Sequence, residues 1–400
     1  MARISGGRAF VAVIFAFVLM TSGVLIPTPM YGAYQEKFGF TVATSTVIYA
    51  VYSLGVLIAL LVFGRWSDTL GRRPILLAGL TIALISHALY FSAESTSMLL
   101  VARVLSGMST GVFVGAATAS VIELATPTWR ERAPLVTTII SIIGPCLGPL
   151  VTAILMDALP WDLHLTFVVY GALTAAAIVL VIFIPETVMR RPGVRPQFQR
   201  PTVPAAARKA FAVASVACFA GFAITGLMAA VSPQFVAQAI DNPSHVVQVL
   251  VVVLIFASSV IGQVAFQGFP TQPAIVVGCV LLTVGSLLLV LALATDSFVL
   301  MLLASAVTGV GHGAAFSKGL ASVLEKVGRD VRAGVTSAFF IVAYLSLSVP
   351  VIAEGIAARR WGITPASIVF TSAGAVLAGG ALIYLLIEQR RVLTPSIPRP

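Results

Sequence analysis

Residues 64–73 read GRWSDTLGRR and place one acid and three arginines between two apolar runs, 49–63 and 74–91. Only 10% of the residues in the chain are charged, so this concentration is unusual. Gly71 favours the left-handed backbone that turns a chain after a helix, and Gly64 lets two helix ends approach closely. Arginines do not cross a bilayer and mark its cytoplasmic side. The stretch, called the hinge loop below, predicts a tight polar connection between two membrane helices.

The hinge loop resembles the signature between the second and third helices of the major facilitator superfamily, G-x-x-x-D-x-x-G-R-[RK]. The matching residues are Gly64, Asp68, Gly71, Arg72 and Arg73. Thr69 stands where a basic residue is common, so part of the family's charge network is expected to be missing. The resemblance implies an all-α membrane protein with twelve transmembrane helices in two pseudo-symmetric six-helix domains. The alternative is an ordinary polar loop that happens to be basic.

Composition also indicates an integral membrane protein. The 400 residues are 59% hydrophobic, and the mean hydropathy is +1.05. The net charge of +10 comes from short connections between apolar runs, so these residues orient the chain and are not expected to bind nucleic acid. Three cysteines, Cys146, Cys218 and Cys279, lie in apolar runs without metal-ligand spacing. We expect buried thiols, no metal and no cofactor.

Spanning about 30 Å of hydrocarbon takes roughly 20 helical residues. Twelve segments reach this length. Those of the first half are 10–31, 44–64, 74–93, 98–123, 133–156 and 163–184; those of the second half are 210–233, 246–267, 274–294, 297–320, 333–354 and 365–387. Glu354 would then stand at the outer end of the eleventh helix. The first segment has no small-residue cleavage site and is expected to be retained as a helix.

The basic residues fix the orientation. If the amino terminus is cytoplasmic, 20 of the 24 lysines and arginines fall on the cytoplasmic side and Lys37, Arg359 and Arg360 on the other. Both termini are therefore expected in the cytoplasm. We expect a multi-pass protein of the cell membrane, a bacterial inner membrane in particular, that works as a monomer.

A proline- and arginine-rich stretch, 185–209, predicts a cytoplasmic linker between the domains 1–184 and 210–400. Similar motifs recur about 200 residues apart in the two halves, which supports this division. Gly107 and Gly111 of the fourth segment align with Gly309 and Gly313 of the tenth. The two halves resemble diverged copies of one duplicated segment.

Arg103 is the one basic residue inside a span of the first half. A charge there costs at least about 2.5 to 3.5 kcal/mol, so it is expected to face a cavity or a partner. Its context, RVLSGMSTG, resembles the fourth-helix motif of drug/proton antiporters, which implies a role in proton transfer. The alternative is a side chain that extends outward to Glu94.

Glu123 closes the same helix at the depth of the hinge loop. The resemblance implies that it joins Asp68 and Arg72 in a charge cluster that latches the two domains in one state. The alternative is a solvated acid at a helix end.

The fifth segment reads SIIGPCLGPL, with Gly144, Pro145, Gly148 and Pro149 on a small-residue stripe. Glycines four apart allow close helix contact, and prolines bend a helix. The run partly resembles the antiporter signature of the fifth helix, although Ile140 stands where another glycine is usual. A packing face is the alternative.

Four residues are candidates for a substrate cavity: Pro27, Tyr31, Thr110 and His312. Pro27 and Pro29 remove backbone donors and distort the first helix, which leaves carbonyls for neighbours to satisfy. His312, which the repeat aligns with Thr110, is a candidate proton or substrate ligand, with a packing histidine as the equal alternative.

The sequence has no phosphate-binding loop and no nucleophile elbow, so neither ATP-driven transport nor an enzyme is expected. The resemblance implies a secondary active transporter with a cavity lined chiefly by helices 1, 4, 7 and 10. Its expected function is proton-coupled efflux of amphipathic small molecules by alternating access. The alternatives are proton-coupled transport of one specific metabolite and a receptor or scaffold without transport.

Overall fold

The computed structural model describes residues 6–64, 66–159, 161, 163–188, 198, 200–328 and 330–393. Within these ranges the chain forms helices and no strand. The first half contains α1 (Gly7–Ser22), η1 (Gly23–Leu25), η2 (Thr28–Met30), α2 (Tyr31–Phe38), α3 (Val42–Phe63), α4 (Trp66–Leu70), α5 (Arg72–Phe91), α6 (Thr96–Leu124), α7 (Ala133–Ala158) and α8 (Leu165–Ile182). The second contains η3 (Ala205–Ala207), α9 (Arg208–Gln238), α10 (His245–Ala265), α11 (Thr271–Ala294), α12 (Phe298–Leu324), α13 (Arg332–Trp361) and α14 (Ile363–Leu393).

The apolar helices confirm an all-α membrane protein. In the described part of the chain, eleven are long and apolar enough to cross a bilayer, and twelve when α7 with its bend is counted as one span. The first span differs most from its expected limits, 10–31, because Pro27 and Pro29 interrupt α1 with two 3₁₀ turns, after which α2 continues to Phe38.

The eleventh helix is also longer than expected, since α13 ends at Trp361 and not near residue 354. Glu354 therefore lies inside the helix and not at its outer end. Its side chain is fully buried, and Oε1 accepts a hydrogen bond from Ser367 Oγ of α14 at 2.6 Å.

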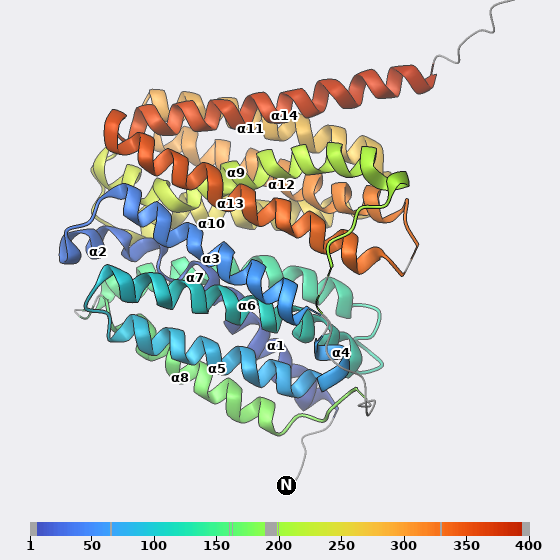
Figure 1. Cartoon of the computed structure of the whole chain (residues 1–400). Coiled ribbons are helices and arrows are strands. Elements are labelled where there is room, and N and C mark those ends of the chain that lie inside the picture. Colours follow the sequence, from blue (N-terminus) through green and yellow to red (C-terminus); the bar gives the residue numbers. More distant parts are fainter. Residues whose placement is uncertain are drawn as a thin grey trace, which may run out of the picture.

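The helices form two six-helix halves whose neighbouring pairs correspond (Figure 1). In the first half α6 packs against α3 and α5, and in the second α12 packs against α10 and α11. The halves meet along α3 with α13 and α7 with α10. The exact domain limits, 184 and 210, stay a prediction, since residues 189–197 and 199 of the linker lie outside the described residues.

Two ends of the bundle are distinguished below. The hinge face carries the start of α1, the hinge loop and the loop before α7, and the far face carries α2 and the start of α10. In Figure 1 the hinge face, with α4, is at the right, and the far face, with α2, is at the left.

Aligned glycines hold the paired helices close in both halves. A Cβ on Gly107 would overlap the Tyr52 carbonyl of α3, and one on Gly309 would overlap the Ile255 carbonyl of α10. Both glycines sit at the positions that the 200-residue offset aligned. Close backbone approach through small residues is the usual way for helices to pack in a bilayer.

Gly107→Leu is expected to destabilise the protein by about 1 to 3 kcal/mol or more, because the atom in the way is backbone and cannot move aside. Gly115→Leu, on the same helix, is the matched control: Gly115 is exposed, and nothing lies within 4 Å of an added Cβ. The measurement is thermal unfolding in detergent. Equal melting temperatures for the two variants would contradict the packing argument.

Candidate functional site

A cavity of about 350 Å³ lies between the halves. The expected helices all contribute to its wall, through Thr21 of α1, Thr110 of α6, Phe222 of α9 and His312 of α12. The wall also includes residues of α3, α7, α10 and α13, which the sequence analysis did not anticipate. The volume suits one small organic molecule.

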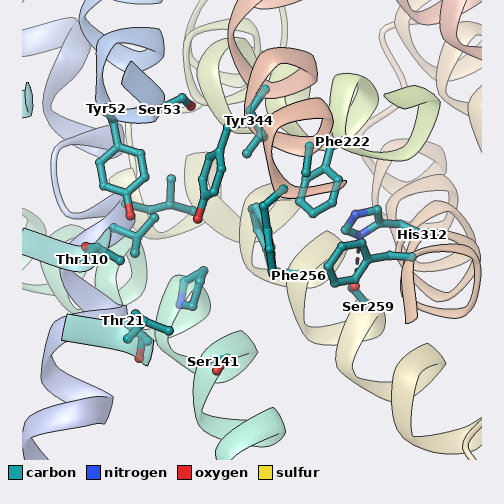
Figure 2. A pocket seen from close by; sticks show the side chains of 18 of the residues that line it. Thr21, Tyr52, Ser53, Thr110, Ser141, Phe222, Phe256, Ser259, His312 and Tyr344 are labelled. Carbon is teal, nitrogen blue, oxygen red and sulfur yellow. Dashed lines mark hydrogen bonds between the residues drawn. The ribbon is translucent and has the colours of Figure 1, made fainter. Parts of the chain in front are cut away.

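Aromatic rings from both halves line this wall (Figure 2). Phe222 meets the His312 ring edge-on at 4.5 Å between centroids and the Phe316 ring at 5.1 Å. Tyr52 of α3 and Tyr344 of α13 point their hydroxyls toward the same space, away from Phe222 and His312 (Figure 2). The cavity is thus apolar on one side and bears hydroxyls on the other.

His312 is one of the candidate residues that line the cavity. Its side chain is 4% exposed, and Nδ1 lies 3.0 Å from Ser259 Oγ of α10 (Figure 2). Nε2 has no hydrogen-bond partner in the described part of the chain. The ring therefore has a packing role and a free nitrogen, so both interpretations of the sequence remain open.

Arg103 also lines the cavity and is buried, with 1% of its surface exposed. Its guanidinium carbon lies 4.6 Å from the Tyr52 ring centroid and 5.7 Å from that of Tyr49. Nη1 donates a hydrogen bond of 2.7 Å to the Val24 carbonyl. Among the described residues no carboxylate pairs with it, and it does not extend to Glu94.

Pro27 and Tyr31 do not line the cavity, in contrast to the expectation. The 3₁₀ turns carry both past it toward the far face, where each is buried. Their neighbourhood still matters, because the interrupted helix presents the Val24 carbonyl to Arg103. The sequence correctly indicated that a neighbour must satisfy a carbonyl freed at this break.

The small-residue stripe of α7 serves two purposes. Gly144 and Gly148 pack against Thr21 and Ser22 of the first span, and Pro145 lines the cavity. Pro145 lacks the N–H that would bond to the Ser141 carbonyl, and α7 bends by 41° between residues 141 and 143. Pro149 lies one turn further along the same helix.

The hinge loop forms the predicted charge cluster. Arg72 Nη1 contacts Asp68 Oδ1 at 2.5 Å, and Arg72 Nη2 contacts Glu123 Oε1 at 3.1 Å. Gly71 has a φ of 102°, as expected for the turn before α5, whereas Gly64 keeps a right-handed φ of −55°. Arg73 follows Arg72 in the first turn of α5.

Glu186 is a further member of this cluster, which was not predicted from the sequence. Its carboxylate accepts the backbone N–H groups of Arg72 at 2.8 Å and Arg73 at 3.2 Å, and so caps the start of α5. The neighbouring Thr187 donates to Glu123. The available signal was an acid directly after Pro185, at the end of the sixth span. All these contacts lie within the first half or join it to the start of the linker, and none reaches a described residue of the second half, so the latch between domains stays a prediction.

On the far face, a second polar cluster does join the halves. Asp157, at the end of α7, accepts the backbone N–H groups of His245 at 3.0 Å and Val246 at 3.1 Å. It also contacts Ser244 Oγ at 2.8 Å and His245 Nδ1 at 2.7 Å. An acid of the first half thus caps α10 of the second, which suits the positive end of a helix.

The hydrogen bonds between the halves lie from mid-height to the far face. Besides the Asp157 cap, Ser348 Oγ of α13 donates to the Ala50 carbonyl of α3 at 3.2 Å. Between the described residues of the hinge face, none joins the halves. This conformation is therefore held closed at the far face.

Asp157→Asn is expected to weaken this closure by about 1 to 2 kcal/mol, because hydrogen bonds to a charged group are the stronger ones and this one is partly exposed. The measurement is the distance between spin labels at Glu36 and Arg360, exposed residues of the far face on either half. The variant should populate longer distances. Asp296→Asn, which changes an exposed acid of the same face, is the control, and an equal shift in both would contradict the role of Asp157.

The chain was compared with known proteins. A family model described as Major Facilitator Superfamily matches residues 9–350. The multidrug resistance protein MdtL of Klebsiella pneumoniae (strain 342) is 28% identical over 194 residues, 47% of each chain. The chain spans less than half the length of the curated relatives that it matches first.

Solved transporters share the fold over almost the whole chain. The nucleoside transporter NupG superposes with a TM-score of 0.70 at 13% identity, covering 95% of this chain and 98% of that one. The human organic anion transporter MFSD10 (TETRAN) gives 0.66 at 19% identity, covering 94% and 99%. Together with the two six-helix halves around a central cavity, the match over residues 9–350 shows that this chain belongs to the major facilitator superfamily.

Proposed function

We propose that this chain is a secondary active transporter that exports amphipathic small molecules in exchange for protons, by alternating access. The observation that carries the proposal is the cavity between the halves, which combines phenylalanine rings with tyrosine hydroxyls and one guanidinium. Such a surface suits amphipathic molecules better than sugars, which need several amides and carboxylates.

The conformation supports alternating access. The halves are held together at the far face by Asp157 and nearer mid-height by Ser348. With the hinge face in the cytoplasm, as the arginine distribution predicts, the cavity would load from the cytoplasm. Opening toward the far face requires breaking the Asp157 cap, and the hinge-loop cluster is the proposed latch of the opposite state.

The alternative is proton-coupled transport of one specific metabolite. Relatives give no single answer, because their names specify multidrug resistance, nucleoside transport and organic anion transport. The identities to the two solved structures are below 20% and support the fold alone. Monomeric function in the cell membrane, with both termini in the cytoplasm, completes the proposal.

The test is transport by the purified protein in proteoliposomes with an imposed pH gradient and a trapped pH-sensitive dye. The substrate panel contains amphipathic dyes of each charge and a set of amino acids, sugars and carboxylates. Gradient-driven accumulation of several dyes with matching proton movement is expected. Accumulation of a single metabolite would favour the alternative, and no gradient-driven flux of any compound would overturn the proposal.

A further inference from the structure

Arg103 is a buried cation without an anionic partner in the described part of the chain. Its neutral contacts include the Val24 carbonyl and the rings of Tyr49 and Tyr52, and the side chains of Tyr31 and Tyr90 also interact with it. One hydrogen bond uses one of the five N–H donors of a guanidinium, and Nε has no partner. A buried charge normally pairs with an opposite charge or shifts toward neutrality, and arginine stays charged.

The cavity itself supplies no counter-charge. Its described lining contains no aspartate or glutamate, and Arg103 is its one permanently charged side chain. The fold does contain a buried carboxyl, Glu354, but it bonds to Ser367 and does not line the cavity. The positive charge of Arg103 therefore has no opposite charge in the empty cavity, and a bound anion would supply one.

We propose that the cavity selects organic anions, with a carboxylate or sulfonate paired to Arg103 and an aromatic body against the phenylalanine side of the wall. A guanidinium presents a fixed fork of donors that matches the two oxygens of such a group. This inference names the substrate class and rests on the proposed function only in taking the cavity as the substrate site.

The lining fits this orientation of the ligand. Thr110 and the Tyr52 hydroxyl lie on the same side of the cavity (Figure 2). Thr110 Oγ1 already donates to the Ser106 carbonyl at 3.1 Å, so the Tyr52 hydroxyl is the donor that this side offers to the anionic group. Phe222, Phe256 and the His312 ring lie on the opposite side (Figure 2). An aromatic ring gains from offset or edge-on contacts with these groups. A cationic ligand would instead be repelled by the positive charge of Arg103, and the described lining has no carboxylate to offset that repulsion.

The test uses three probes with one ring system: 2-naphthoate, its neutral isostere 2-naphthamide, and 2-naphthylmethylammonium. Binding to the full chain is measured by calorimetry in nanodiscs of zwitterionic lipid at neutral pH. We expect naphthoate to bind at least about tenfold more tightly than the amide, in line with a charge-assisted bidentate pair, and the ammonium to bind most weakly.

Variants assign the preference to one side chain. Arg103→Gln should reduce the preference for naphthoate over the amide to about twofold or less, and Arg103→Lys should restore part of it. Arg360→Gln is the matched control, because it removes one positive charge at the exposed end of α13. It should keep the full preference. If Arg103→Gln does not fold, the three probes on the natural chain still test the charge preference.

Equal binding of the three probes, preference for the ammonium, or a preference that survives in Arg103→Gln would overturn the inference. The binding measurement needs no proton gradient, so it tests anion selectivity separately from the proposed proton-driven transport. A charge-selective protein without proton-driven flux would refute the transport mechanism alone. Proton-driven flux of neutral and cationic dyes without anion preference would refute the inference alone.

Discussion

Asp68→Asn is expected to reduce the transport rate about fivefold or more while substrate affinity stays near that of the natural chain. Asp68 lies on α4 at the hinge face and does not line the cavity. Its carboxylate contacts Arg72 Nη1 at 2.5 Å, so it acts on the arrangement of α4, α5 and α6 and not on bound substrate. A change of about 1 to 3 kcal/mol in a conformational equilibrium is enough for this effect.

The measurement pairs initial transport rates in proteoliposomes with equilibrium binding of the same substrate. Glu131→Gln is the control, since Glu131 is an exposed acid of the same face, in the loop before α7. It should leave the rate unchanged. If substrate affinity fell as steeply as the transport rate in Asp68→Asn, the latch would be contradicted. A latch residue acts on the balance between conformational states and does not contact the substrate.

The parts of the fold that depend on local chemistry could be predicted from the sequence. Apolar runs of about 20 residues gave the spans, because the bilayer requires that length. The turn at Gly71 followed from the freedom of glycine at positive φ, and the break in the first span followed from Pro27 and Pro29. Each of these features is determined by the sequence of its own segment, without contacts to distant parts of the chain.

Partners that depend on packing between distant segments could not be predicted. Glu186 reaches the start of α5 from 113 to 114 residues away, and Asp157 caps α10 from 87 to 89 residues away. The same holds for the cavity: the family resemblance indicated α1, α6, α9 and α12, but packing also brings side chains of α3, α7, α10 and α13 into the wall. Tyr31 was misplaced for another reason, because the 3₁₀ turns at Pro27 and Pro29 carry it past the cavity.

Arg103→Ala is expected to abolish gradient-driven accumulation of a neutral amphipathic substrate while sparing its downhill exchange, with Arg103→Lys intermediate. Proton coupling of this kind needs a proton carrier in the same cavity as the fixed charge, and because the described lining holds no carboxylate, His312 is the candidate. Arg103 is the permanently charged residue in the described lining, and it joins α6 to the broken first span through the Val24 carbonyl. Lysine keeps the charge but loses the planar fork.

A neutral substrate is chosen because loss of an anion-binding group would lower both modes of transport of an anion. The measurement compares accumulation under an imposed pH gradient with counterflow of labelled substrate at equal pH, in the same proteoliposomes. Arg360→Gln, which should accumulate substrate normally, controls for the change in net charge. If Arg103→Ala concentrates the neutral substrate as well as the natural chain, Arg103 has no part in proton coupling. If Arg103→Ala also retains the preference for naphthoate, the buried charge of Arg103 serves neither proton coupling nor anion binding.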